Sequence, residues 1–194
     1  MKLSRKIFLV AAMAALAGAA LAQNSNQHFA KDGLSFDYPG GWTTDESKSS
    51  SQMQYLTLGR DGYAMIVVRA PRALVDTPDK EANAKKLMQE GFVDAWIKNF
   101  EGQGAKPERT TVQTEIAGGP AECTRLSASL DGEPGRVDIC YRMLEKKMIQ
   151  IAIIGSTRDI TRSAPAWDSI RNSLKIEPPP QKSAPAASPS PAKP

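Results

Sequence analysis

A pair of cysteines placed around a tight-turn signal is the feature that most constrains how this chain folds. Two strand-like runs flank Asp131-Gly132, and Asp-Gly is among the strongest signals for a two-residue hairpin loop. If Leu130 faces Glu133 across that turn, opposite residues have numbers that total 263, and Cys123 then faces Cys140. Alternation along the ladder makes this a non-hydrogen-bonded pair, with Cα atoms about 4.5 Å apart. That separation is within reach of a disulfide.

The same register passes two further tests. It puts Pro134 in a non-hydrogen-bonded pair, where the missing proline N–H costs the ladder nothing, and it sets Arg125 opposite Asp138. The loop closed by the two cysteines has 16 intervening residues, for which the chain-entropy model gives about 3 kcal/mol. A redox-active pair is the alternative, but neither a Cys-x-x-Cys spacing nor a neighbouring histidine is present to lower a thiol pKa. We therefore predict a structural disulfide between Cys123 and Cys140.

The first 22 residues have the three parts of a secretory signal peptide. The basic start consists of Lys2, Arg5 and Lys6. An apolar run over residues 7–21 follows, and Ala20 and Ala22 form a small-residue cleavage site before Gln23. A membrane anchor is the alternative, but the run is shorter than the roughly 20 apolar residues that span a bilayer. We predict cleavage after Ala22 and a periplasmic or secreted protein, where a disulfide persists.

Export changes how the net charge is interpreted. The 194-residue chain carries a formal charge of +4, and three of those charges lie in the predicted signal peptide, which has no acidic residue. The mature protein is therefore near neutral, which argues against a nucleic-acid binder and against electrostatic attachment to a membrane. The single histidine, His28, lies in a predicted loop near the mature N-terminus. We expect no cofactor, metal or catalytic site that depends on it.

Composition divides the chain into four segments. Residues 1–22 are the signal peptide, and residues 23–28 are a short linker. Residues 29–176 form a single globular domain. Residues 177–194 carry seven of the 14 prolines and no large apolar side chain, so we predict a disordered Pro/Ala/Ser-rich tail with polyproline II character.

Hydrophobic periodicity predicts the elements of the domain. Strands are expected over residues 33–38, 54–59 and 63–69. A long helix should follow, with Thr77 as cap, Pro78 in its first turn and an end near Gly102. The apolar stripe predicted to pack on a sheet consists of Ala84, Met88, Phe92, Trp96 and Phe100, with Leu87 and Ala95 beside it.

The second half is predicted to repeat this arrangement. Strands are expected over residues 108–116, 121–130, 137–144 and 148–155. A short helix should begin near Ser163-Ala164-Pro165. The order indicates the α+β class, an antiparallel sheet covered by helices.

Both ends of the domain resemble the PsbP-like domain family. Residues 29–42, FAKDGLSFDYPGGW, resemble the family's opening strand with Tyr-Pro and a nearby Trp, and residues 167–176, WDSIRNSLKI, resemble its last helix and strand. The resemblance implies an α/β/α sandwich and a non-enzymatic binding or assembly factor of the kind found among lumenal photosystem subunits and exported bacterial proteins. Photosystem members of the family are associated with calcium and chloride retention, but no ligand residue can be matched here.

Three functions are compatible with these features. The first is an exported binding or assembly module with an extracytoplasmic protein partner and an unidentified ligand. The second is a hydrolase that uses a carboxylate pair, either Asp37 with Asp45 or Glu115 with Glu122. The third is a cell-envelope surface protein that uses its tail as a spacer. A deep polar pocket would favour an enzyme or ligand binder, whereas an exposed apolar patch would favour a protein partner.

Overall fold

The computed structural model describes residues 25–177 of the chain. The predicted signal peptide, its cleavage site at Ala20, Ala22 and Gln23, and the predicted tail beyond Glu177 lie outside the described residues. The elements follow in the order β1 (Gln27–Lys31), β2 (Leu34–Tyr38), β3 (Thr43–Asp45), β4 (Met53–Gly59), β5 (Met65–Pro71), α2 (Pro78–Ala84), η1 (Lys85–Glu90), α3 (Gly91–Gly102), β6 (Glu108–Ile116), β7 (Gly119–Leu130), β8 (Glu133–Leu144), β9 (Lys147–Ser156), α4 (Thr157–Ser173) and β10 (Lys175–Ile176).

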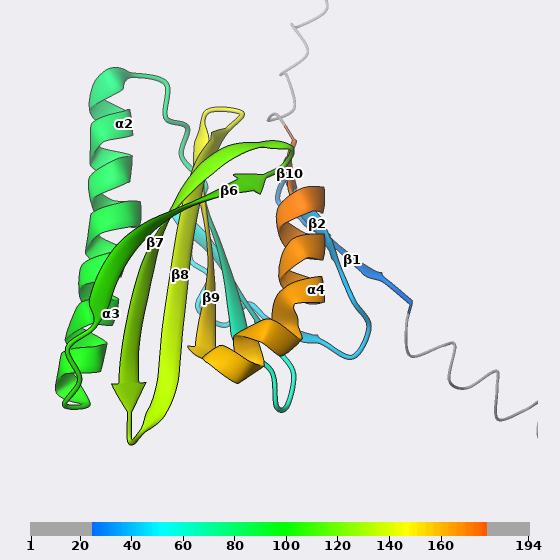
Figure 1. Ribbon diagram of the computed structural model, residues 1–194. Helices are drawn as coiled ribbons and strands as arrows, with labels where there is room; N and C mark the ends of the chain where they lie inside the picture. The colour runs from blue at the N-terminus through cyan, green and yellow to red at the C-terminus, as the bar shows by residue number, and fades with distance from the viewer. Residues whose placement is uncertain (1–24, 178–194) are drawn as a thin grey trace, which may run out of the picture.

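A seven-stranded antiparallel sheet is the centre of the molecule, with strand order β3-β4-β5-β9-β8-β7-β6. The consecutive segments α2, η1 and α3 form one helical rod on one face, and α4 lies on the other face (Figure 1). A small sheet of order β1-β2-β10 joins the α4 side. The predicted α+β class, an antiparallel sheet with helices on both faces, is confirmed.

Each face of the large sheet has its own apolar core. Under α4 and the small sheet, the fully buried side chains include Phe36, Leu56 and Ile151. Under the helical rod the core is smaller and includes Val93 and Leu126. The near-continuous burial of β9 reflects its place at the middle of the sheet, covered on both faces.

The β7–β8 hairpin has the predicted register. Cys123 faces Cys140, and Leu130 faces Glu133 at the turn. The turn residues Asp131 and Gly132 have φ angles of 51° and 84°, as a two-residue I′ turn requires. The two cysteine sulfur atoms are 1.99 Å apart and form a disulfide between buried side chains.

The prediction for the last helix was wrong at its start. Helix α4 begins at Thr157, where the Ser156 hydroxyl caps it by accepting a hydrogen bond from the Asp159 N–H at 3.1 Å. Pro165, which we placed in the first turn, lies inside the helix. The helix changes direction along its length (Figure 1), as an interior proline produces.

The chain ends of the domain meet in the small sheet, which the sequence did not predict. β1 begins at Gln27, inside the segment predicted as a linker, and β10 pairs with β2. His28 therefore lies on a strand rather than in a loop, and its Nδ1 is 2.6 Å from the Asp37 carboxylate. Within residues 25–177, no helix has both the length and the apolar character needed to cross a bilayer.

Candidate functional site: an apolar groove beside a π-helical turn

An apolar groove of about 660 Å³ lies where the helical rod meets the ends of β4 and β5. Its floor includes Met53 and Pro71, which face each other at the end of the β4–β5 ladder. Its walls are the segment 72–77 on one side and residues of α2 and η1 on the other. The aliphatic side chains that line it are Met53, Ala73, Leu74, Val75, Leu87 and Met88.

Leu87 makes this groove unusual for a folded protein surface. Its side chain is 72% exposed, and the only other large hydrophobic residue in the described part of the chain with substantial exposure is Met65, at 37%. We predicted that Leu87 and Ala95 flank the stripe that packs on the sheet, and this was wrong for both, because both are exposed. A leucine held open beside other aliphatic side chains is typical of a contact surface for another molecule.

A π-helical turn explains where Leu87 points. In η1 the Gly91 N–H donates to the carbonyl of Lys86, five residues earlier. The two buried side chains of this stretch are accordingly five residues apart, Met88 and Val93, which are 2% and 0% exposed. This wider turn shifts the buried stripe relative to a regular α-helix and leaves Leu87 on the groove side. Such π-helical insertions occur frequently at functional sites.

Buried polar contacts hold η1 against the sheet. The Arg69 guanidinium donates from Nη1 to Gln150 Oε1 at 2.6 Å, and the Gln150 amide donates to the carbonyl of Met88. The guanidinium carbon also lies 4.7 Å from the centre of the Phe92 ring and 5.8 Å from that of Tyr55. Burial lowers the pKa of Arg69 from its usual value. The π turn is therefore anchored through its backbone as well as by packing.

A second set of contacts continues this polar row across the sheet. Gln89 donates to the Tyr141 hydroxyl, which donates to Glu122 Oε1 at 2.9 Å. Burial raises the pKa of Tyr141 to about 12, and the adjacent Glu122 carboxylate adds to the effect. Because Gln150 faces Tyr141 and Tyr141 faces Glu122 in the strand register, the row is built on neighbouring strands. It fixes the position of η1, which forms part of one wall of the groove.

The outer wall of the groove is held by polar contacts at its two ends. The Val75 N–H donates to the carbonyl of Lys146 at 2.6 Å, and the Arg72 N–H donates to Gln52 at 2.9 Å. At the rim, Lys80 pairs with Asp76 at 2.6 Å, and the hydrogen bond from Lys80 lowers the pKa of that carboxyl group. The result is an apolar groove with a charged rim.

Three of the four carboxylates that we considered as catalytic pairs are held in local contacts. Asp37 lies beside His28 on the small sheet, and Asp45 lies on β3, where hydrogen bonds from Ser47 lower its pKa. Glu115 and Glu122 share a face of β6 and β7, but Glu122 faces Gln113 in the register and accepts from Tyr141. Among residues 25–177 no group of three or more His, Cys, Asp or Glu side chains is placed to hold a metal ion.

One feature of the sequence points to this groove. Leu74 and Val75 are aliphatic residues shortly before the helix cap at Thr77, in a segment with no strand or helix pattern. Hydrophobic residues in such a connection need another surface to cover them. Leu87, which lines the groove with them, is 12 residues further along the chain from Val75, on a turn whose π geometry has no recognisable sequence signature.

Comparison with known proteins gives a likeness to solved structures but no match in sequence. No protein-family model matches the chain, and no curated protein matches it in sequence. Among solved structures, the chain is similar to "Solution Structure of Cyanobacterial PsbP (CyanoP) from Synechocystis sp. PCC 6803", with 14% identity and a TM-score of 0.49. The match covers 79% of this chain and 94% of that chain. The match identifies no ligand or partner for this chain.

Proposed function

We propose that the protein is an exported, non-enzymatic binding or assembly module, and that its groove receives an aliphatic segment of an extracytoplasmic protein partner. The observation that carries the proposal is the exposure of Leu87 over an otherwise aliphatic groove. The predicted signal peptide and the Cys123–Cys140 disulfide support the extracytoplasmic location.

The form of the groove favours a protein over a small molecule. Small-molecule sites commonly bury 70–90% of their ligand, which requires enclosing walls. Here Leu87 is 72% exposed, so that wall is open to solvent. An apolar centre bordered by the Lys80–Asp76 pair also has the core-and-rim arrangement of protein interfaces.

Crosslinking from within the groove tests the proposal. A photoreactive amino acid replaces Leu87 in one variant and Ala95 in a control, which is also exposed and lies on the same helical rod. We expect a discrete adduct with an envelope protein from position 87 and none from position 95. The identified partner is then purified, and its affinity is measured for the wild type, Leu87→Asp and Ala95→Asp.

Burying one leucine contributes roughly 1.5–3 kcal/mol, so Leu87→Asp should weaken binding about 10- to 100-fold. Ala95→Asp adds the same charge outside the groove and should leave the affinity within about 3-fold of the wild type. The proposal is overturned if no adduct forms from position 87, or if the purified partner binds Leu87→Asp as tightly as the wild type.

A further inference from the structure

The two edges of the large sheet differ in how far their outward backbone groups are paired. At one edge, β3 has only three residues, and the segment before β4 bonds to the part of β4 that β3 leaves unpaired. There Ser49 Oγ accepts from the Tyr55 N–H at 2.9 Å and donates to the Tyr55 carbonyl at 3.0 Å, and the Ser50 N–H donates to Met53. The other edge is β6, a nine-residue strand that pairs with β7 alone among the residues that the structure describes.

The backbone groups that β6 presents outward follow from its turn. Ile116 faces Gly119 across a two-residue turn in which both residues have positive φ, so that pair is hydrogen-bonded. Alternation then directs the N–H and carbonyl groups of Arg109, Thr111, Gln113 and Glu115 away from β7. The Glu115 carbonyl confirms that this set of residues faces away from β7, because it accepts a hydrogen bond from Arg171 of α4 at 2.9 Å.

The outward groups of Arg109, Thr111 and Gln113 have no hydrogen-bond partner in the part of the chain that the structure describes. Most side chains of β6 are exposed, and the strand contains neither a proline nor a lysine to discourage pairing. A long edge of this kind is a template for another strand.

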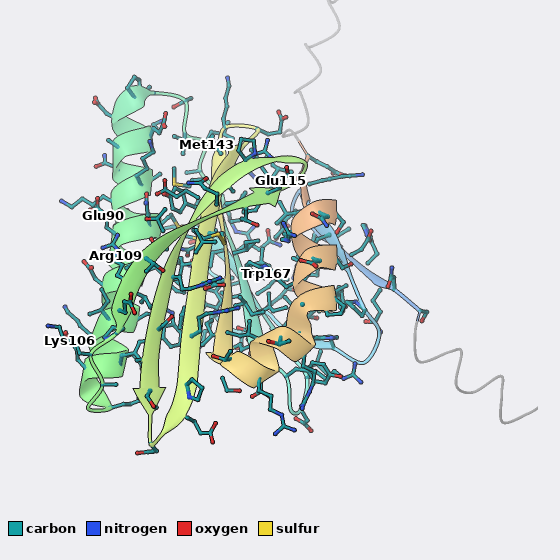
Figure 2. The ribbon with its side chains drawn as sticks, viewed as in Figure 1. Glu90, Lys106, Arg109, Glu115, Met143 and Trp167 are labelled. Atoms are coloured by element: carbon teal, nitrogen blue, oxygen red, sulfur yellow. A yellow bond between two sulfur atoms is a disulfide. The ribbon has the colours of Figure 1, made fainter. Side chains whose placement is uncertain are left out.

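The strand is complementary to a second copy of itself. In an antiparallel two-fold pairing centred on Val112, the outward groups of the two copies meet, and Arg109 of each copy faces Glu115 of the other. Thr110 faces Thr114, and opposite-charge and threonine pairs are favourable cross-strand neighbours. Arg109 and Glu115 are exposed and form no ion pair with another residue in the range 25–177. Figure 2 labels both residues along β6.

We propose that the protein forms a two-fold dimer in which β6 pairs with β6 of a second copy, joining two sheets into one continuous antiparallel sheet. Charge complementarity selects this register, because a shift by two residues removes the contacts between Arg109 and Glu115. The Glu115 carbonyl keeps its bond from Arg171, since a carbonyl oxygen accepts two hydrogen bonds. The groove at Leu87 is at the far end of the sheet order, so the dimer is independent of its occupant.

Charge reversal tests the pairing by sedimentation velocity of the mature protein over about 1–500 μM. Arg109→Glu and Glu115→Arg should each weaken the dimer at least 10-fold, because like charges then face each other. The double variant R109E/E115R should return within about 3-fold of the wild type. Thr111→Pro should abolish the dimer, because it removes an outward N–H but no bond to β7. Far-UV circular dichroism and the melting temperature check that each variant is folded.

A cysteine pair provides a second measurement. The double variant T110C/T114C should form a disulfide-linked dimer on mild oxidation, whereas each single variant should not, because its thiol would face a threonine. The proposal is overturned if the wild type is a monomer at all concentrations. It is also overturned if a dimer forms that is unaffected by Thr111→Pro and by charge reversal. Binding of an extended peptide in place of a second copy would likewise overturn it.

Discussion

Gln150 is the residue on which the position of the π turn depends most directly, and its replacement by leucine is a sharp test of the site. The side chain is 1% exposed, accepts from Arg69 at 2.6 Å and donates to the carbonyl of Met88. Leucine is close to glutamine in size but makes neither bond. The substitution therefore removes both contacts with little change in packing volume.

The expected cost follows from the two partners left behind. Losing a hydrogen bond to a charged group costs about 1.5–3 kcal/mol, and an unsatisfied carbonyl costs about 1–3 kcal/mol. Arg69 has little capacity to compensate, because its Nε is already buried without a partner in the described structure. We expect Gln150→Leu to lower the free energy of unfolding by about 3–5 kcal/mol, a shift of roughly 6–20 °C in the melting temperature for a domain of this size.

Urea unfolding followed by tryptophan fluorescence measures the change, since Trp96 lies on α3 above the same face of the sheet. A double-mutant cycle with Arg69→Met separates the interaction from packing. Removing both partners should cost less than the sum of the single changes, with a coupling energy of at least 1 kcal/mol, because no buried charge is then left unpaired. A loss below about 1 kcal/mol for Gln150→Leu, or additive single effects, would refute the reasoning.

The remaining predictions concern the disulfide, the tyrosine and the N-terminus. Reducing the Cys123–Cys140 bond should lower the free energy of unfolding by about 3 kcal/mol. The double variant Cys123→Ala/Cys140→Ala should lower it further, because it also removes buried sulfur atoms. Equal stability of the oxidised and reduced protein would contradict this prediction. The pKa of Tyr141 is raised to about 12 in the folded state, whereas an unperturbed tyrosine has a pKa near 10. The folded state therefore holds the phenol proton more tightly than the unfolded chain. The stability that this proton contributes is lost as the pH rises from 10 to 12. The stability difference between the wild type and Tyr141→Phe should therefore shrink from pH 10 to 12, and a constant difference would be inconsistent with the shift. Mass spectrometry of the exported protein should find Gln23 as the first residue and no free thiol, whereas an intact N-terminus would exclude cleavage after Ala22.

Where prediction succeeded, the information was local. The β7–β8 register depended on Asp131-Gly132 and a count along two adjacent strands, and the rod began at Thr77 because a capping side chain acts within one turn. Where prediction failed, two local signals competed, or the relevant contact was distant. Pro165 is acceptable in a first turn and also in the middle of a bent helix, and only the packing of α4 distinguishes these cases.

The sequence by itself therefore determined the hairpin that carries the cysteine pair, the α+β order of elements and the start of the helical rod. Only the tertiary structure decided that β5 pairs with β9, that β10 joins β2, and that Leu87 opens onto a groove with Leu74 and Val75. The physical reason is the range of the interactions. Turns, caps and strand register across a short loop are set by residues a few positions apart. A groove and a free sheet edge arise from segments that meet only when the chain is folded.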